Sequence, residues 1–170
     1  MEKDVIETGR LEMRGWRIED AEALFKYASD GRVSELALWP RHESVEMSRY
    51  VIENFFMPNP DCFAIVLKQS GEPIGCIGLV PSGDEHCPIN ADEREVGYWI
   101  GYPHWGQGYV TEALEGIIGY CRSEMGLKSL VITTDSKNIA SQRVAEKCKF
   151  NWMSDYIHNG IPSKSYKLTL

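Results

Sequence analysis

The sequence has no long apolar run and no cluster of basic residues. Its apolar stretches are far shorter than the roughly 18–20 residues of a membrane span, so we expect no membrane association. The opening residues, MEKDVIETGR, are charged and lack the apolar core of a signal peptide, which predicts a cytoplasmic location. The net charge of −7 argues against nucleic acid as a partner and mildly favours a cationic substrate.

Paired cysteines and metal-ligand spacings are also missing. The five cysteines are an odd number without a C-x-x-C pair, which argues against a disulfide framework or a thiolate zinc site. We interpret them as reduced thiols that lie mostly in the core. The four histidines show no chelating spacing, and no Ser-His-Asp or Cys-His set is detectable, so no metal is expected.

Hydrophobic periodicity predicts one mixed α/β domain over residues 1–170, with hairpins and crossovers, and neither a doubly wound sheet nor a barrel. We expect strands within 4–18, 62–68, 74–81, 94–101 and 128–135, one or two more over 152–170, and helices over 20–30, 44–56, 110–126 and 138–150. Asp20 and Ser44 are the expected N-caps of the first two helices, and Gly126 ends the third. The polar residues 82–93 read as a loop.

A glycine-containing segment, WGQGYVTEA at 105–113, lies between an expected strand and an expected helix. Gly106 and Gly108 would remove side chains and permit unusual dihedral angles, so several N–H groups and the helix N-terminus could cradle a phosphate. The segment is neither a nucleoside-triphosphate P-loop nor a complete dinucleotide fingerprint. Taken alone, a tight structural turn explains the two glycines equally well.

Four consecutive motifs, of which this segment is one, give a more specific signal than the segment alone. They are E-V-G-Y-W-I on a strand, W-G-Q-G-Y-x-T-E-A at the helix start, D-x-x-N-x-x-S after the next strand, and a closing Lys-x-x-Phe. This succession resembles the GNAT superfamily of acetyl-coenzyme A-dependent N-acyltransferases, and most the branch that includes the ribosomal-protein N-terminal acetyltransferases. The opening ETGRLEMR also resembles the first strand of that branch, with Thr8, Arg10 and Leu11 in place. The resemblance implies a GNAT-like α/β (α+β) domain with a mixed, mostly antiparallel sheet flanked by helices on both faces.

The resemblance also implies roles for individual residues in binding acetyl-coenzyme A. The pantetheine arm would bond to main chain near Trp99 and Ile100, Asn138 would contact it, and Ser141 would lie near the thioester sulfur. The loop and helix start would hold the pyrophosphate through residues Trp105, Gly106, Gln107, Gly108, Tyr109, Val110 and Thr111. Asn138 could equally cap its helix, and Ser141 could equally bond to local backbone.

Acetyl transfer to an amine requires a neutral amine, and Glu95 is our candidate general base, acting directly or through a water. On the strand REVGYWI it shares a face with Gly97 and Trp99, although a solvated carboxylate is the alternative. Ser141 is the candidate donor to the leaving thiolate.

Three positions depart from the family pattern. Val110 replaces a small residue, Lys149 replaces the usual glycine before Phe150, and Ala145 replaces the tyrosine that is the commonest general acid of the superfamily.

We therefore predict direct transfer of an acetyl group to a primary amine, either a protein N-terminal α-amine or a small molecule. The departures leave open a non-catalytic acyl-coenzyme A sensor or interaction module, and a nucleotide- or other phosphate-binding protein is a third possibility. A homodimer is implied by the resemblance alone.

Overall fold

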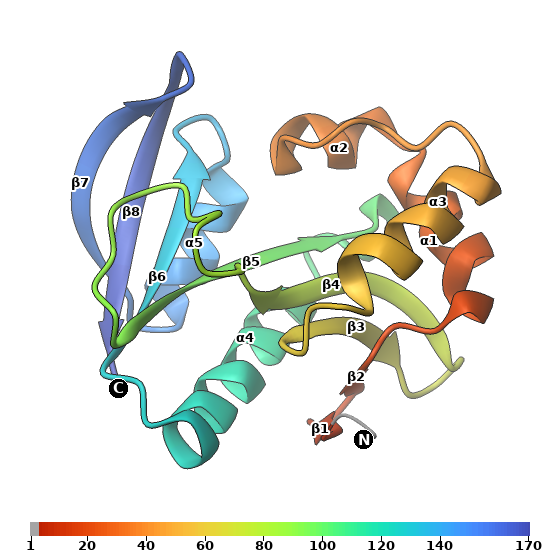
Figure 1. The fold of residues 1–170 in the computed structure, drawn as a ribbon, viewed down its shortest axis with the longest axis horizontal. Coiled ribbons are helices and arrows are strands. Elements are labelled where there is room, and N and C mark those ends of the chain that lie inside the picture. Colours follow the sequence, from red (N-terminus) through yellow and green to blue (C-terminus); the bar gives the residue numbers. More distant parts are fainter. Residues whose placement is uncertain (1–3) are drawn as a thin grey trace. The chain divides into compact units, whose positions relative to one another are not determined.

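The computed structural model describes residues 4–170, which form eight strands and five α-helices (Figure 1). The strands are β1 (Ile6–Glu7), β2 (Leu11–Arg14), β3 (Cys62–Leu67), β4 (Glu72–Leu79), β5 (Glu93–Ile100), β6 (Ser129–Asp135), β7 (Asn151–His158) and β8 (Ile161–Thr169). The helices are α1 (Ala21–Ala28), α2 (Gly31–Ala37), α3 (Val45–Val51), α4 (Tyr109–Tyr120) and α5 (Ile139–Lys147). π-helical turns at Ile52–Phe56 and Cys121–Met125 extend α3 and α4.

The strands form a mixed sheet in the order β1-β2-β3-β4-β5-β6-β8-β7. β5 and β6 pair in parallel, whereas β1–β2, β2–β3, β3–β4, β6–β8 and β7–β8 pair antiparallel. The expected mixed, mostly antiparallel sheet is therefore confirmed. No helix within residues 4–170 has both the length and the apolar character needed to cross a bilayer.

The chain divides into two compact units, each described here by itself. The first unit contains the chain up to Gly78 together with Tyr98–Ala113, and the second contains Leu79–Gly97 together with Leu114–Leu170. β5 and α4 each contribute residues to both units.

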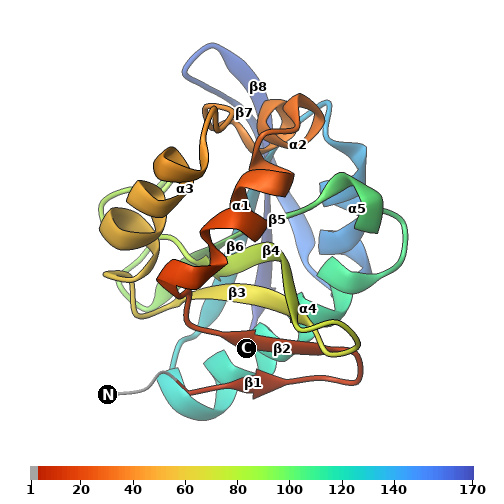
Figure 2. The same cartoon turned by 90° about the vertical axis from the view of Figure 1, so that its right-hand side faces the viewer.

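The core of the first unit lies between its strands and helices α1 and α3, which cover one face of β3 and β4 (Figure 2). Alternate residues of β3, Cys62, Ala64 and Val66, pack in one cluster with Leu24 of α1 and with Ile52. Full burial of a Leu or Ile side chain stabilises a fold by about 1.5–3 kcal/mol. This apolar face therefore anchors the two helices on the β3–β4 hairpin.

The N-terminal part of the first unit differs from the sequence prediction. The single strand expected over 4–18 is two short strands, β1 and β2, which pair across a turn at residues 8–10. Helix α2 was not predicted, because it is short and starts with a glycine, a poor helix former. The side chain of Asp30 caps it by accepting a hydrogen bond from the Arg32 N–H.

The helix caps and helix faces agree in part with the sequence prediction. Ser44 caps α3 through a 3.0 Å bond from the Met47 N–H, as predicted. Asp20 occupies the N-cap position of α1, but the predicted capping bond is absent among the described residues. Its carboxylate instead pairs with the buried guanidinium of Arg14 at 2.8 Å. In the π-helical turn that follows α3, Ile52 is fully buried whereas Phe55 is 60% exposed.

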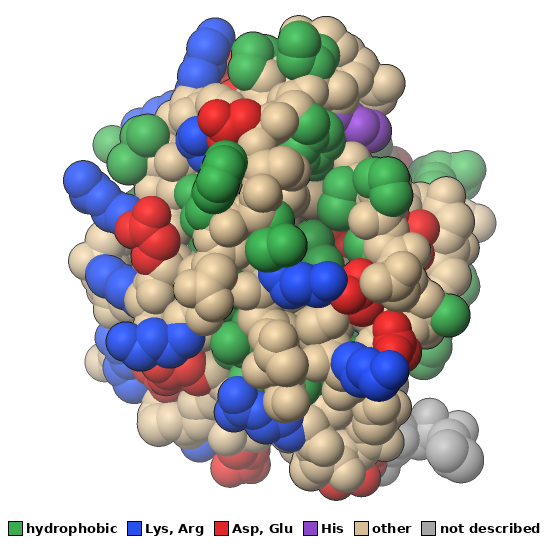
Figure 3. Space-filling model, turned by 90° about the vertical axis from the view of Figure 1, so that its left-hand side faces the viewer, with side chains coloured by type: hydrophobic (Ala, Val, Ile, Leu, Met, Phe, Trp, Pro, Cys, Tyr) green, Lys and Arg blue, Asp and Glu red, His purple; other side chains and the backbone are tan. Residues whose placement is uncertain are grey.

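The second unit ends in two strands, β7 and β8, where one or two strands were predicted over residues 152–170. β7 is the edge strand, and it exposes the large side chains of Trp152, Met153 and Ile157. On the face of the molecule drawn in Figure 3, hydrophobic, basic and acidic side chains are interspersed, without a surface of one charge sign. In α5 the inward residues are Ser141, Ala145 and Cys148, while Val144 is only half-buried.

Candidate active site

The glycine loop adopts a backbone that requires glycine at two positions. Gly106 and Gly108 have φ of +72° and +79°, in the left-handed region that L-residues with side chains rarely adopt. The turn Tyr102–His104 precedes the loop and α4 follows it directly. The two glycines therefore permit the unusual dihedral angles that were predicted for this segment.

The main-chain N–H groups of the loop are available to a ligand. Within residues 4–170, the N–H groups of residues 106–110 donate no hydrogen bond, whereas the Glu112 N–H bonds to the Gly108 carbonyl at 3.1 Å. The N-terminus of a helix carries about half a positive charge. Five consecutive unused donors at such an end form a suitable cradle for a phosphate group.

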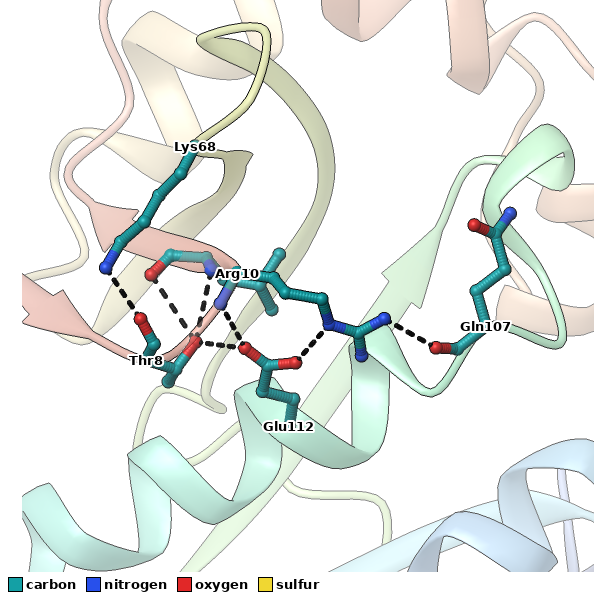
Figure 4. Close-up of polar contacts among 6 residues, drawn as sticks. Thr8, Arg10, Lys68, Gln107 and Glu112 are labelled. Carbon is teal, nitrogen blue, oxygen red and sulfur yellow. Dashed lines mark hydrogen bonds and ion pairs between the residues drawn. The ribbon is translucent and has the colours of Figure 1, made fainter.

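Arg10 ties this loop to the β1–β2 turn (Figure 4). Its Nη1 donates to the main-chain carbonyl of Gln107 at 2.9 Å, and its Nε donates to Oε2 of Glu112 at 2.7 Å. The guanidinium also lies over the ring of Tyr109, 4.3 Å from the ring centroid. A positive charge therefore lies beside the unused N–H groups.

Glu112 is the centre of the same network (Figure 4). Its Oε1 accepts bonds from the hydroxyl of Thr8 at 2.6 Å and from the main-chain N–H of Arg10 at 2.7 Å. Burial raises the pKa of Glu112, but the bonds from Thr8 and Arg10 outweigh this effect and lower it. Thr8 and Arg10 match the first strand of the family branch in sequence, but no part in the site was predicted for them.

Aromatic residues support the loop and the end of β5. The indole Nε1 of Trp105 donates to the main-chain carbonyl of Ile100 at 2.9 Å, so Trp105 anchors the loop to β5. The amide of Gln107 bonds to the Pro103 carbonyl at 3.1 Å. Trp99 packs edge-on against Trp39 at 5.6 Å between ring centroids. The first unit thus brings together the predicted cofactor residues Trp99, Ile100, Trp105, Gly106, Gln107, Gly108, Tyr109, Val110 and Thr111.

In the second unit, Glu95 is 2% exposed and lies near the end of a short parallel ladder. β5 and β6 pair only over Glu93–Glu95 and Ser129–Val131, whereas β6 pairs with β8 over its whole length. Glu95 Oε1 accepts bonds from His86 Nδ1 at 2.8 Å and from the Thr133 hydroxyl at 2.5 Å. Its Oε2 accepts the main-chain N–H of His86 at 2.8 Å. Burial raises the pKa of Glu95, but these bonds outweigh it and hold the pKa below its usual value.

Cys87 lies beside this carboxylate but is a poor nucleophile. Burial, followed by the negative charges of Glu95 and Glu93, raises the pKa of the Cys87 thiol to about 11. Since the thiolate is the reactive form of cysteine, Cys87 is protonated and unreactive near neutral pH. The other four cysteines are buried, which agrees with the expected core thiols.

Asn138 and Ser141 meet at the start of α5. The Asn138 Oδ1 accepts the Ser141 N–H at 3.1 Å, so Asn138 does cap the helix. Ser141 is buried on the inner face of α5, one turn before Ala145. Lys149, which replaces the family's glycine, has φ of +69°. This left-handed conformation is strained for a residue with a side chain. Within the part of the chain that the structure describes, no group of three His, Cys, Asp or Glu residues could hold a metal.

Comparisons with known proteins identify the family of the chain. Residues 10–151 match the model of the acetyltransferase (GNAT) domain. The chain is 28% identical over 166 residues to the uncharacterized N-acetyltransferase YoaA of Bacillus subtilis, covering 93% of this chain and 91% of that protein. It is 26% identical over 151 residues to the uncharacterized N-acetyltransferase p20 of Bacillus licheniformis, covering 86% of this chain and 82% of that protein.

Solved structures share the fold. A GNAT-family acetyltransferase from Bacillus anthracis superimposes with a TM-score of 0.82 at 21% identity, covering 98% of both chains. The ribosomal L7/L12 α-N-protein acetyltransferase RimL in complex with coenzyme A has a TM-score of 0.74 at 18% identity, covering 98% of both chains. The chain therefore belongs to the GNAT family and is an N-acetyltransferase that uses acetyl-coenzyme A.

Proposed function

We propose that this enzyme acetylates a primary amine by direct attack of the amine on the thioester of acetyl-coenzyme A. The acceptor is a protein N-terminal α-amine or a small-molecule amine. The observation that carries the proposal is the row of unused N–H groups at residues 106–110, with the guanidinium of Arg10 beside them. This arrangement fits the coenzyme pyrophosphate, which the main-chain N–H groups of residues 106–110, within the predicted binding segment Trp105–Thr111, would bind.

The remaining binding residues follow the family pattern. The main chain at Trp99 and Ile100 would bond to the pantetheine arm, and Asn138 would contact the same arm while it caps α5. Ser141 would lie near the sulfur and donate a hydrogen bond to the departing thiolate. Glu95 would support, as the predicted general base, removal of the proton from the amine. Such a base is useful because the pKa of an α-amino group is about 7.7–8.0 and that of a lysine side chain about 10.4, so much of the amine is protonated near pH 7.

Direct attack is favoured over an acyl-enzyme by the protonated state of Cys87, a cysteine close enough to Glu95 to be affected by its charge. The thiol of Cys87 has its pKa raised to about 11, so it does not offer a thiolate for acylation. A cytoplasmic location is also part of the proposal. Neither nucleic acid nor a membrane takes part in the proposed reaction.

Self-association is a further part of this proposal. The edge strand β7 exposes Trp152, Met153 and Ile157, and such an edge is a template for pairing with a second copy. Light scattering of the wild type and of Ile157→Lys tests it: a dimer that the substitution splits supports the role of β7. A monomeric wild type would contradict it.

The function is tested first by calorimetric titration with acetyl-coenzyme A and with coenzyme A. Micromolar binding of both, with ATP binding much more weakly, is the expected result. A panel of peptides and small amines is then screened for thiol release, with mass spectrometry of the acceptor. We expect Glu95→Gln to bind acetyl-coenzyme A as the wild type does and to lose most turnover. Absence of coenzyme binding up to millimolar concentration would overturn the proposal.

A further inference from the structure

The carboxylate of Glu95 is poorly placed to take a proton from a substrate itself. Both oxygens accept hydrogen bonds, two on Oε1 and one on Oε2, from donors of His86 and Thr133, and the side chain is buried. Hydrogen bonds to the charged form of a carboxylate make it a weaker base. A direct proton transfer to Glu95 would have to reach the one lone pair that these donors leave, on Oε2 of a side chain that is only 2% exposed.

His86 offers the other end of the same hydrogen bond. Because a carboxylate only accepts, Nδ1 of His86 donates to Glu95, and the neutral ring therefore carries its lone pair on Nε2. The main-chain bond from His86 to Oε2 fixes the residue on the loop before β5. The His86 side chain is 50% exposed, unlike that of Glu95, so a substrate can reach the ring.

We propose that Glu95 and His86 form a dyad in which His86 Nε2 removes the proton from the acceptor amine. Glu95 is then a positioning residue, which holds the tautomer of His86 and stabilises the imidazolium. This inference rests on the proposed function and names a catalytic residue for it. The two residues have the same roles as in other carboxylate–histidine pairs, in which the carboxylate orients the histidine and the histidine acts as the base.

The amine nitrogen attacks the thioester carbon, a C–N bond forms, and the nitrogen becomes positively charged. His86 Nε2 takes the N–H proton, the C–S bond breaks, and the coenzyme A thiolate leaves with the electron pair. His86 releases its proton to solvent and the thiolate is protonated from solvent, so the products are an amide and free coenzyme A.

The surroundings of His86 set the pH at which the dyad works. The bond to Glu95 raises the pKa of His86 above its usual 6.5, burial opposes this, and the carboxylate of Asp84 adds to the increase. The ring of His158 lies edge-on to that of His86, at 5.4 Å between centroids. The neighbouring Cys87 thiol and Tyr156 hydroxyl, with pKa values of about 11 and about 12, remain neutral.

The first experiment is an NMR titration of the histidine ring signals, with His86 assigned from the spectrum of His86→Gln. It needs no turnover and is therefore independent of the acceptor. We expect His86 to titrate above 6.5 in the wild type and at lower pH in Glu95→Gln. Identical titration of His86 in both proteins would overturn the dyad.

The second experiment is kinetic, on full-length protein and any amine that the wild type acetylates. We expect His86→Ala to lower kcat about 100-fold, to leave the Kd for acetyl-coenzyme A unchanged, and to regain activity with added imidazole. The increase of kcat/KM with pH that reflects His86 should shift to lower pH in Glu95→Gln and disappear in His86→Ala. His158→Gln is the matched control and should retain wild-type turnover.

The results distinguish a failure of the Glu95–His86 dyad from a failure of the proposed function. If His86→Ala and His86→Gln keep wild-type turnover while Glu95→Gln loses it, Glu95 acts without His86 and the dyad alone is wrong. If the wild type binds acetyl-coenzyme A but acetylates no amine, the proposed function fails and the catalytic role of the dyad fails with it.

Discussion

Arg10 Nη1 donates a hydrogen bond of 2.9 Å to the main-chain carbonyl of Gln107, so a residue of the first turn holds the middle of the glycine loop. With this carbonyl bonded to Arg10, the N–H groups of the loop remain available for a phosphate. Arg10 therefore has two effects on the cradle, one on its shape and one on its charge.

Removal of this guanidinium should weaken coenzyme binding. We expect Arg10→Ala to raise the Kd for acetyl-coenzyme A about tenfold, which corresponds to about 1.4 kcal/mol, measured by calorimetry. Arg49→Ala, which removes an exposed arginine from α3, is the control and should bind as the wild type does. An unchanged Kd in Arg10→Ala would show that the loop keeps its shape without the bond.

Two glycines with the same conformation separate backbone strain from ligand contact. Gly106 in the loop and Gly71 in the β3–β4 turn both have φ of +72°, and an added Cβ meets no atom within 4 Å at either site. Each substitution by Ala should therefore lower the free energy of unfolding by about 1 kcal/mol. Only Gly106→Ala should also weaken acetyl-coenzyme A binding, as measured by calorimetry beside thermal denaturation. Equal affinities of the two variants would place the phosphate elsewhere.

The two roles of Asn138 are separable by substitution. Asn138→Ala removes the cap of α5 and should cost about 1 kcal/mol of stability, whereas Asn138→Asp keeps a capping oxygen and should cost less than about 0.5 kcal/mol. If the amide contacts the pantetheine arm, both variants bind acetyl-coenzyme A more weakly than the wild type. Wild-type affinity in Asn138→Asp would leave Asn138 as a cap alone.

Glu93 should make the stability of the protein depend on acid pH. Burial raises its pKa, but bonds from Lys167, the Asn90 N–H and the Ser129 hydroxyl outweigh burial and lower the pKa to about 2. Because the pKa is depressed in the folded state, the stabilisation is fully present above the ordinary value of 4.5 and is lost as pH falls toward about 2.

The measurement is urea denaturation of Glu93→Gln at several pH values. We expect a loss of about 2 kcal/mol at pH 7 that shrinks steadily below pH 4.5. Glu115→Gln, at an exposed position on α4, should change stability little at any pH. A pH-independent loss in Glu93→Gln would mean that packing, and not the ion pair, is responsible.

The sequence determined the elements that carry the site, because local conformation leaves a local pattern. The short β-rich apolar run CFAIVLK, the period of 3.6 in VTEALEGIIGYC and the two glycines before it were sufficient to predict β3, α4 and the loop. Helix α2 and the division of the first strand into β1 and β2 were not predicted, because short elements contain too few residues to show a period.

Only the tertiary structure decided which side chains meet. Arg10 and Glu112 are 102 residues apart in sequence, and Glu95 and Thr133 are 38 apart, so no local period relates them. Glu95 was predicted as a base from its strand position, but its three hydrogen-bond donors depend on the loop before β5 and on the pairing of β6. Strand pairing and loop closure bring such groups within 3 Å, and these contacts set which group holds a proton.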